Sequence, residues 1–245
     1  MPITIFQNNK GQFKNVTAQA GLLETYGWWN CVESGDFDND GDLDFVVGNH
    51  GLNSRFKASS ENPVLMYVND FDKNQTVEQI LCAYNDGNTY PMMLRHDLVK
   101  QMPVLKKRYL KYEQFKLETI DSIFSPQLLE RSLKLKVTNL ATSILINNGD
   151  GTYTVKALPF EAQYAPTYGI LIEDFDKDGN QDILLGGNQH RVKPEVGRYD
   201  AHHGLVLKGN GKGDFTPLLP RDTGFFLTGE TSLCAYRRVI VISPI

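Results

Sequence analysis

Short apolar runs that end at glycine recur along the chain. Two of them, at residues 45–48 and 183–187, each follow an acidic stretch. Apolar runs of this length, bounded by turn residues, are typical of buried β-strands. We therefore expect each acidic stretch to form a loop between two strands.

Turns rich in asparagine and glycine form a second repeated pattern. At residues 6–13, 146–153 and 207–215, an apolar strand end leads into such a turn and then into an aromatic residue. This order is a β-hairpin signal. Hairpins and acidic stretches alternate along the chain, so the sequence predicts an all-β fold built from repeats.

Residues 95–140 interrupt the strand pattern. Apolar residues recur every three or four positions from Leu98 to Tyr112, which predicts an amphipathic helix with a basic face. A second helix is predicted after Ser125, because Pro126 fits the first turn of a helix. Its apolar residues would be Leu128, Leu129, Leu133 and Leu135. We interpret the segment as a cover on the β-structure; the alternative is a docking surface for an acidic partner.

The acidic stretches share one spacing, which appears twice in full. Oxygen-bearing side chains at the first, third and fifth positions, glycine at the sixth and a carboxylate at the ninth suit a loop around a hard cation such as Ca²⁺. Glycine permits the sharp turn, and the seventh residue would offer its backbone carbonyl. The predicted ligands are Asp36, Asp38, Asp40, Asp42 and Asp44 in the first loop, and Asp174, Asp176, Asp178, Asn180 and Asp182 in the second.

Two other calcium loops do not fit this spacing. An EF-hand loop needs a glutamate at its twelfth position, but Val47 and Leu185 stand there. A dockerin-type loop would be followed by a helix, whereas strand-like runs follow here. The remaining alternative is a pair of solvated turns, because Asp, Asn and Gly are common turn residues. Two full copies in matching contexts favour two calcium sites.

A weaker third copy carries oxygen ligands at Asp70, Asp72, Asn74 and Glu78. Gln75 replaces the glycine, so we expect a strained or different turn. This loop is either a third calcium site or a decayed repeat that keeps only the turn. An aromatic residue fills the second position of all three copies, and we expect it to point into the core. These residues are Phe37, Phe71 and Phe175.

The succession of strand, acidic loop, strand and glycine-rich hairpin resembles FG-GAP and VCBS-type repeats. Residues 48–53, 186–188 and 197–201 are more specifically similar to bacterial VCBS proteins with an ASPIC/UnbV-type region. The resemblance covers most of residues 3–216. It implies an integrin-α-like β-propeller with calcium in the interstrand loops, and a location outside the cell.

The chain is short for a complete propeller. Closed propellers usually have about four to eight blades, and only about three to four fit once the helical segment is set aside. We therefore predict a partial propeller whose strand edges are covered by the rest of a longer chain. The predicted division is blades with the first loops at 3–94, a helical insertion at 95–140, blades with a further loop at 141–228, and an atypical tail at 229–245.

Charge and composition argue against several classes of partner and site. The net charge is only −4 and no basic stripe stands out beyond the central helix, so we expect no nucleic-acid partner. No stretch approaches the roughly 20 apolar residues of a membrane span. Cys31, Cys82 and Cys234 form an odd set without a CxxC pair. They would be small buried hydrophobic residues, or one disulfide and a spare thiol, and they predict no zinc site.

The predicted calcium sites say more about the protein's cellular location than the N-terminal sequence does. The chain enters a strand directly, without a signal peptide, which is uninformative if it is a fragment. Extracellular modules bind calcium with dissociation constants of about 0.1–1 mM, which only a calcium-rich medium fills. We expect an extracellular, cell-surface or periplasmic protein.

A long polar stretch at residues 189–203 is the other candidate site, because long loops in compact domains are often functional. Its side chains could contact a ligand, or act as acid and base in catalysis. The alternative is a loop held by its own ion pairs. The candidate ligand contacts are His190, Arg191, Tyr199, Asp200, His202 and His203.

Three functions remain open on the sequence alone. We favour a non-catalytic, calcium-stabilised module that binds a protein or glycan, as in adhesion. The second is a polysaccharide lyase or hydrolase that uses the stretch at 189–203, although the chain shows no Ser-His-Asp, HExxH or P-loop signature. The third is a purely architectural segment of a larger surface protein.

Overall fold

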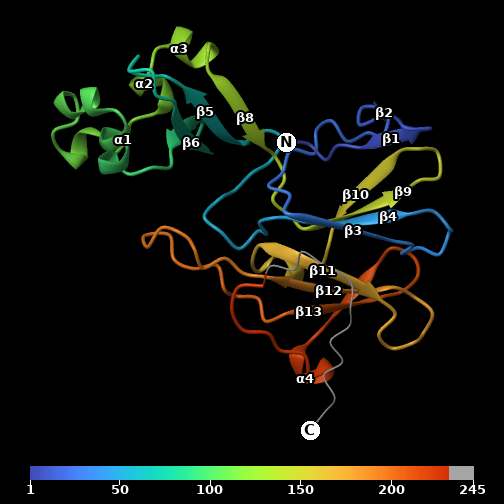
Figure 1. Cartoon of the computed structure of the whole chain (residues 1–245). Helices are drawn as coiled ribbons and strands as arrows, with labels where there is room; N and C mark the ends of the chain where they lie inside the picture. The colour runs from blue at the N-terminus through green and yellow to red at the C-terminus, as the bar shows by residue number, and fades with distance from the viewer. Residues whose placement is uncertain (232–245) are drawn as a thin grey trace. The chain divides into compact units, whose positions relative to one another are not determined.

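The computed structural model describes residues 1–231 (Figure 1). Cys234 and most of the predicted tail at 229–245 therefore lie outside the described residues. The chain divides into two compact units. Unit 1 contains Met1–Ile3, Leu23–Trp28 and Arg55–Leu140, and unit 2 contains Thr4–Leu22, Trp29–Ser54 and the chain from Ala141 onward.

Unit 2 consists of a hairpin and two four-stranded sheets, all antiparallel. The hairpin pairs β1 (Phe6–Asn9) with β2 (Gln12–Asn15). The first sheet has the order β10-β9-β4-β3, and the second has the order β11-β12-β13-β14. Their strands are β3 (Cys31–Gly35), β4 (Asp44–Gly48), β9 (Ser143–Asn147), β10 (Tyr153–Ala157), β11 (Thr167–Glu173), β12 (Asp182–Gly187), β13 (Leu205–Gly209) and β14 (Phe215–Leu218).

The strands of the two sheets of unit 2 pair in equivalent registers, and the two sheets pack around one core. Phe45 pairs with Leu145 across β4 and β9, and Ile183 pairs with Leu207 across β12 and β13. Apolar side chains from both sheets, such as Val46, pack into one cluster. Two short helices, η3 (Phe160–Gln163) and α4 (Pro220–Thr223), complete the described part of the unit. The matching registers make the sheets two copies of one structural repeat.

The main segment of unit 1, Arg55–Leu140, is inserted in the chain between two paired strands of unit 2. The chain leaves the first sheet after β4 and returns to it at β9. Between them lies another antiparallel sheet, with the order β7-β6-β5-β8. Its strands are β5 (Val64–Asn69), β6 (Glu78–Asn85), β7 (Asn88–Pro91) and β8 (Leu133–Val137). The insertion therefore has its own sheet and its own acidic loop.

Short helices cover the core of unit 1. They are α1 (Arg95–Gln101), η1 (Pro103–Lys107), η2 (Tyr112–Gln114), α2 (Ile120–Ile123) and α3 (Pro126–Glu130). Leu98, Met102 and Tyr109 are buried, as their spacing predicts, in the same core as Cys82. Burial raises the pKa of the Cys82 thiol to about 12, so this cysteine is a small hydrophobic residue with an unreactive thiol.

The structure corrects the two helices predicted for residues 95–140. The first helix ends at Gln101, because Pro103 cannot donate the backbone bond that would continue it. The second ends at Glu130, and Leu133 and Leu135 lie in β8, which pairs with β5. Residues 133–137 alternate leucine and lysine, a strand period, and the edge of β5 offers the unpaired backbone groups that stabilise it.

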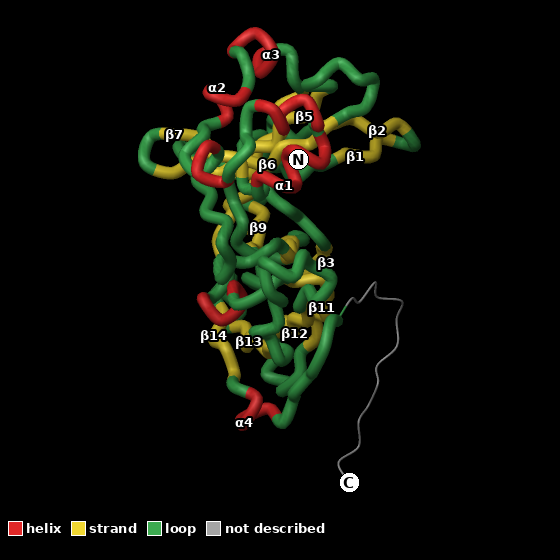
Figure 2. Tube along the Cα trace, turned by 90° about the vertical axis from the view of Figure 1, so that its left-hand side faces the viewer, coloured by secondary structure: helices red, strands yellow, loops and turns green. Residues whose placement is uncertain are grey.

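The predicted all-β class is confirmed by the four antiparallel sheets and the few short helices (Figure 2). A closed propeller is not shown by residues 1–231, and the four-part division of the chain stays a prediction. Within the same residues, no helix combines the length and apolar character needed to cross a membrane.

Candidate functional site

Each acidic loop joins two neighbouring antiparallel strands, as the flanking residues predict. Residues 36–44 link β3 to β4, residues 70–78 link β5 to β6, and residues 174–182 link β11 to β12. We call them the first, middle and last loops. The first and last loops belong to unit 2, and the middle loop belongs to unit 1.

The three loops have the same backbone conformation at their tightest point. The fourth residue of each loop has a positive φ, and so does the sixth. Gly41 and Gly179 at the sixth position both have a φ of 91°, and Gln75 in the middle loop has a φ of 71°. A left-handed conformation is costly for a residue with a side chain. The middle loop thus keeps the turn, at the cost of the strain that its missing glycine predicts.

The first carboxylate of each loop holds this turn together. The backbone N–H of Gly41 donates to Asp36 at 3.1 Å, that of Gln75 to Asp70 at 2.9 Å, and that of Gly179 to Asp174 at 2.9 Å. These bonds span only five residues. The local sequence is therefore sufficient to specify the turn.

The ninth carboxylate closes each loop from inside the protein. Asp44, Glu78 and Asp182 are almost fully buried. Each accepts a bond from the backbone N–H of the aromatic residue at the second position, over 3.0 Å, 2.8 Å and 3.1 Å respectively. Hydrogen bonds from N–H groups to a carboxylate are among the stronger ones in proteins. The ninth residue is thus a structural anchor, whether or not an ion is bound.

In unit 2 this anchor also reaches the third strand of the sheet. The second oxygen of Asp44 accepts the N–H of Asn147 in β9 at 2.7 Å, and that of Asp182 accepts the N–H of Gly209 in β13 at 2.9 Å. Asp44 is also a predicted metal ligand. Both of its oxygens already accept a backbone N–H, which leaves each with one further lone pair. The spacing within the loop carries no sign of these strand partners.

Side-chain oxygens from the loops gather in three groups among the described residues. The ligand atoms in each group lie within 4.8 Å of one another. The groups are Asp36, Asp38 and Asp40; Asp70, Asp72 and Glu78; and Asp174, Asp176 and Asp182. Of the other predicted carboxylate ligands, Asp44 and Asp178 lie outside these groups. Metal binding by any of these residues stays a prediction.

The first loop has the chemistry of an incomplete cation site. One carboxylate oxygen of Asp36 and one of Asp38 are buried and have no hydrogen-bond partner among the described residues. Burial raises the pKa of Asp38, and repulsion from Asp40 and Asp36 adds to the increase. A buried, unpartnered carboxylate oxygen is costly. A divalent cation would remove this cost, so the residues present fit calcium.

The last loop already holds a positive charge. Lys208 in β13 forms ion pairs with Asp176 and, at 2.9 Å, with Asp178. The bond from Lys208 lowers the pKa of Asp178, and the two carboxylates raise the pKa of Lys208. The residue in the matching register of the first sheet is Ile146, which carries no charge. Sequence reasoning missed Lys208, although it lies within a recognised hairpin signal at residues 207–215.

The first and last loops touch each other within unit 2. The side-chain amide of Asn39 donates to the side-chain oxygen of Asn180 at 3.0 Å. The N–H of Gly213, in the turn after β13, donates to the carbonyl of Phe37 at 3.0 Å. The two loops therefore lie side by side, and an ion bound in one of them would change the electrostatic potential at the other.

The aromatic residue at the second position is buried in two of the three loops. Phe37 lies edge-to-face against Phe215 of the neighbouring sheet, and Phe71 packs on Phe124. Phe175 is 43% exposed, so the prediction that it points into the core is wrong. It lies on the last sheet of the described residues, and no further sheet follows there to cover it.

The candidate residues in the stretch at 189–203 differ in their exposure. Arg191, Asp200 and His203 are exposed, whereas His202 is buried. The backbones of Gln189 and Tyr199 pair with each other and close the stretch into a compact loop. No metal-ligating group among residues 1–231 includes a histidine.

The remaining candidates are held by structural contacts. Tyr199 packs edge-to-face on His50 at 5.0 Å, and His203 stacks on Phe226 at 4.6 Å. The N–H of His190 donates to Glu230 at 3.3 Å. Burial lowers the pKa of His202 to about 4, so its imidazole is neutral at pH 7. Ligand contact by the six candidate residues of this stretch stays a prediction.

Comparisons with known proteins bear on the first part of the chain. Neither the curated proteins nor the solved structures gave a match. A model of the FG-GAP-like repeat matches residues 1–47, which contain the hairpin β1-β2, β3, the first loop and almost all of β4. The chain therefore carries an FG-GAP-like repeat in the segment that forms the first acidic loop.

Proposed function

We propose that the chain is a calcium-stabilised repeat module of the β-propeller type that binds a protein or glycan. The observation that carries the proposal is a pair of buried oxygens, on Asp36 and Asp38, that have no partner in the described part of the chain and lie within a turn that recurs in three loops. A cation is the partner that satisfies several such oxygens at once. The FG-GAP-like repeat over the same loop supports it.

In this proposal calcium has a structural role. Asp36, Asp38 and Asp40, with the backbone carbonyl of Asp42, would hold the ion in the first loop. Bound calcium neutralises clustered carboxylates and stabilises the fold by its binding free energy. In the last loop the ion would compete with Lys208, so this site should bind calcium more weakly. The middle loop is the weakest candidate, because its turn is strained at Gln75.

The proposal also includes the compartment in which the protein works and its likeness to one group of repeat proteins. A weak calcium site fills only in a calcium-rich medium, which supports an extracellular, cell-surface or periplasmic protein. The finer likeness to VCBS proteins with an ASPIC/UnbV-type region stays a prediction, as does a longer propeller chain around this module. An enzyme is the less favoured alternative, because His202, one of its acid–base candidates, is buried away from a ligand in solution.

Thermal unfolding in calcium and in EDTA tests the proposal. With 10 mM calcium and a dissociation constant of about 0.1–1 mM, each occupied site adds about 1.4–2.7 kcal/mol. For a chain of this size we expect a rise of about 3–10 °C per site. Asp38→Ala should remove most of the calcium-dependent rise, whereas Asp222→Ala, an exposed residue outside the loops, should keep it. An equal melting temperature in calcium and EDTA would refute the proposal.

A further inference from the structure

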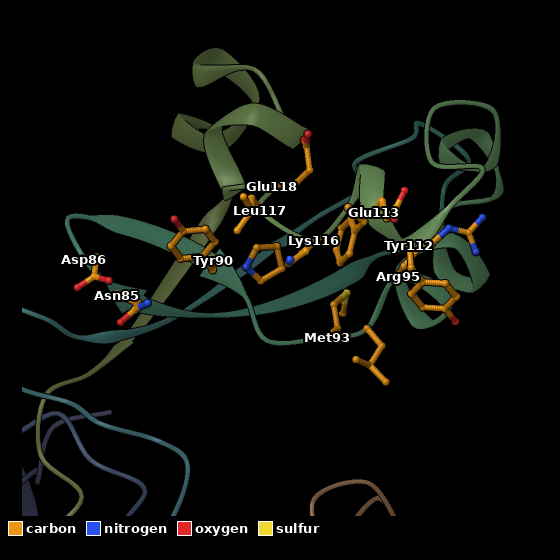
Figure 3. A pocket seen from close by; sticks show the side chains of 13 residues that line it. Asn85, Asp86, Tyr90, Met93, Arg95, Tyr112, Glu113, Lys116, Leu117 and Glu118 are labelled. Atoms are coloured by element: carbon orange, nitrogen blue, oxygen red, sulfur yellow. The ribbon is translucent and has the colours of Figure 1, made fainter.

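A groove of about 680 Å³ opens in unit 1, in the part of the chain inserted between β4 and β9 (Figure 3). Its volume lies within the range of small-ligand sites. Three segments line it: the tip and second strand of the β6-β7 hairpin, residues 93–95, and residues 112–118. None of the acidic loops contributes to it.

One wall of the groove presents a fixed aromatic ring. The Arg95 guanidinium lies over the Tyr112 ring, 5.3 Å from its centre, and donates to the carbonyl of Tyr109 at 2.6 Å. A ring nitrogen of His96 lies 3.2 Å from the Tyr112 hydroxyl. Tyr112 nevertheless remains 58% exposed. An aromatic ring that is already held in place loses little entropy when a ligand packs on it.

The facing side is equally well defined. Asp86 and Gly87 both have positive φ, 46° and 84°, as a two-residue hairpin turn requires. This turn fixes Asn85 and Asp86 at the tip of the hairpin, and Tyr90 follows on β7 (Figure 3). The groove thus has a second aromatic side chain on a rigid strand.

Polar side chains in the groove are available to a ligand. Among the described residues, the side chains of Asn85, Asp86, Glu113 and Lys116 make no hydrogen bond or ion pair with the protein. Glu118, by contrast, accepts bonds from Arg108, Tyr109 and Ser122 and belongs to the wall. The available groups include both hydrogen-bond donors and acceptors. They therefore suit a ligand rich in hydroxyl groups, because each hydroxyl both donates and accepts hydrogen bonds.

The charges of the groove favour a neutral ligand. Asp86 and Glu113 are balanced by Arg95 and Lys116, and Glu118 is paired with Arg108. Because these charges offset one another, the groove offers little net electrostatic attraction to a polyanion or to a polycation. A second hollow of about 530 Å³, lined by Tyr84 and others, shares Asn85 and Asp86 with the groove. The surface continues past the hairpin tip, which suits a ligand longer than one ring.

We propose that this groove binds a neutral oligosaccharide. The apolar faces of its sugar rings would pack on Tyr112 and Tyr90, and its hydroxyl groups would bond to Asn85, Asp86, Glu113 and Lys116. The inference deepens the proposed function, on which it rests, by naming the ligand class and a site away from the acidic loops.

Saturation-transfer NMR on the full chain tests this assignment. The probes are neutral hexasaccharides of glucose, of mannose and of N-acetylglucosamine. We expect at least one to bind, with roughly three- to tenfold weaker affinity in Tyr112→Ala and Tyr90→Ala. Asn85→Ala, an exposed change that leaves the core intact, should also weaken it. Phe160→Ala, which removes an exposed aromatic side chain of unit 2, should bind as the unaltered protein does.

Each other outcome overturns the assignment. It fails if no hexasaccharide binds, if binding is unchanged in Tyr112→Ala and Asn85→Ala, or if only a charged polyuronate or a peptide binds. Melting in calcium and EDTA separates this failure from failure of the proposed function. A calcium shift without sugar binding refutes only the groove, and sugar binding lost in Tyr112→Ala without a calcium shift refutes only the calcium role.

Discussion

The first and last loops of unit 2 have the same backbone but different electrostatic surroundings. Both turn at a glycine with a φ of 91°, and both are anchored by a buried ninth aspartate that reaches the third strand. Yet Ile146 stands beside the first loop where Lys208 stands beside the last. Within residues 1–231, one loop leaves buried oxygens of Asp36 and Asp38 unpartnered, and the other pairs its acids with an ammonium group.

This difference separates two roles that the repeated spacing combines. The ninth carboxylate and the glycine build the turn and tie it to the sheet. The remaining carboxylates decide how strongly a cation is attracted, and a neighbouring strand modifies that attraction. A repeat can therefore keep its fold while its affinity for an ion changes.

The largest effect should come from removing the anchor. Asp44→Ala leaves the N–H groups of Phe37 and Asn147 buried without an acceptor, which should lower the free energy of unfolding by about 3–5 kcal/mol. Glu78→Ala should cost less, because only one backbone N–H, that of Phe71, bonds to Glu78. Urea unfolding in EDTA measures both. Equal losses in Asp44→Ala and in exposed Asp40→Ala would contradict the anchoring role.

Exchanging Lys208 and Ile146, the residues beside the last and first loops, should reverse the difference in calcium affinity between the loops. Lys208→Ile should raise calcium affinity at the last loop roughly two- to fivefold, because a competing cation is removed near the surface. Ile146→Lys should lower affinity at the first loop by a similar factor. Calorimetric titration measures both, and Lys208→Arg, which keeps the charge, is the matched control. Unchanged affinity in both variants would show that the neighbour is irrelevant.

The smallest effect is a difference in carboxyl titration between the loops. Without calcium, Asp38 should titrate above 3.8 and Asp178 below it, following the directions of their pKa shifts. Asp38 then favours the folded state at low pH and loses this contribution as pH rises through its folded pKa. Asp178 contributes above pH 3.8 and loses its contribution as pH falls through its folded pKa. Carboxyl-detected NMR measures both, and Lys208→Ile should raise the pKa of Asp178 and leave that of Asp38 in the first loop unchanged.

Local contacts explain why the sequence predicts the loops well. The bond between Asp36 and Gly41 spans five residues, and the equivalents in the other loops do the same. The spacing of acids and glycine therefore predicts the turn, and the apolar runs beside it predict the strands. Even Gln75 follows this logic, because the loop retains the left-handed turn without its glycine.

Contacts between distant residues explain what the sequence did not reveal. Asn147 lies 103 residues from Asp44, and Lys208 lies 32 residues from Asp176. The strand at 133–137 exists because it pairs with β5, although its leucines also fit a helical spacing. Pairings of this kind depend on which strand edges meet, and the pattern of apolar residues within one segment does not encode that choice.

The sequence by itself determined the all-β class, the three acidic turns and their place between strands, because these depend on backbone conformation and bonds over a few residues. Only the tertiary structure decided that the ninth aspartates of unit 2 anchor third strands, that Lys208 enters one loop and not the other, and that unit 1 carries a groove. Those features require segments far apart in the chain to meet, and packing of whole sheets and helices controls that meeting.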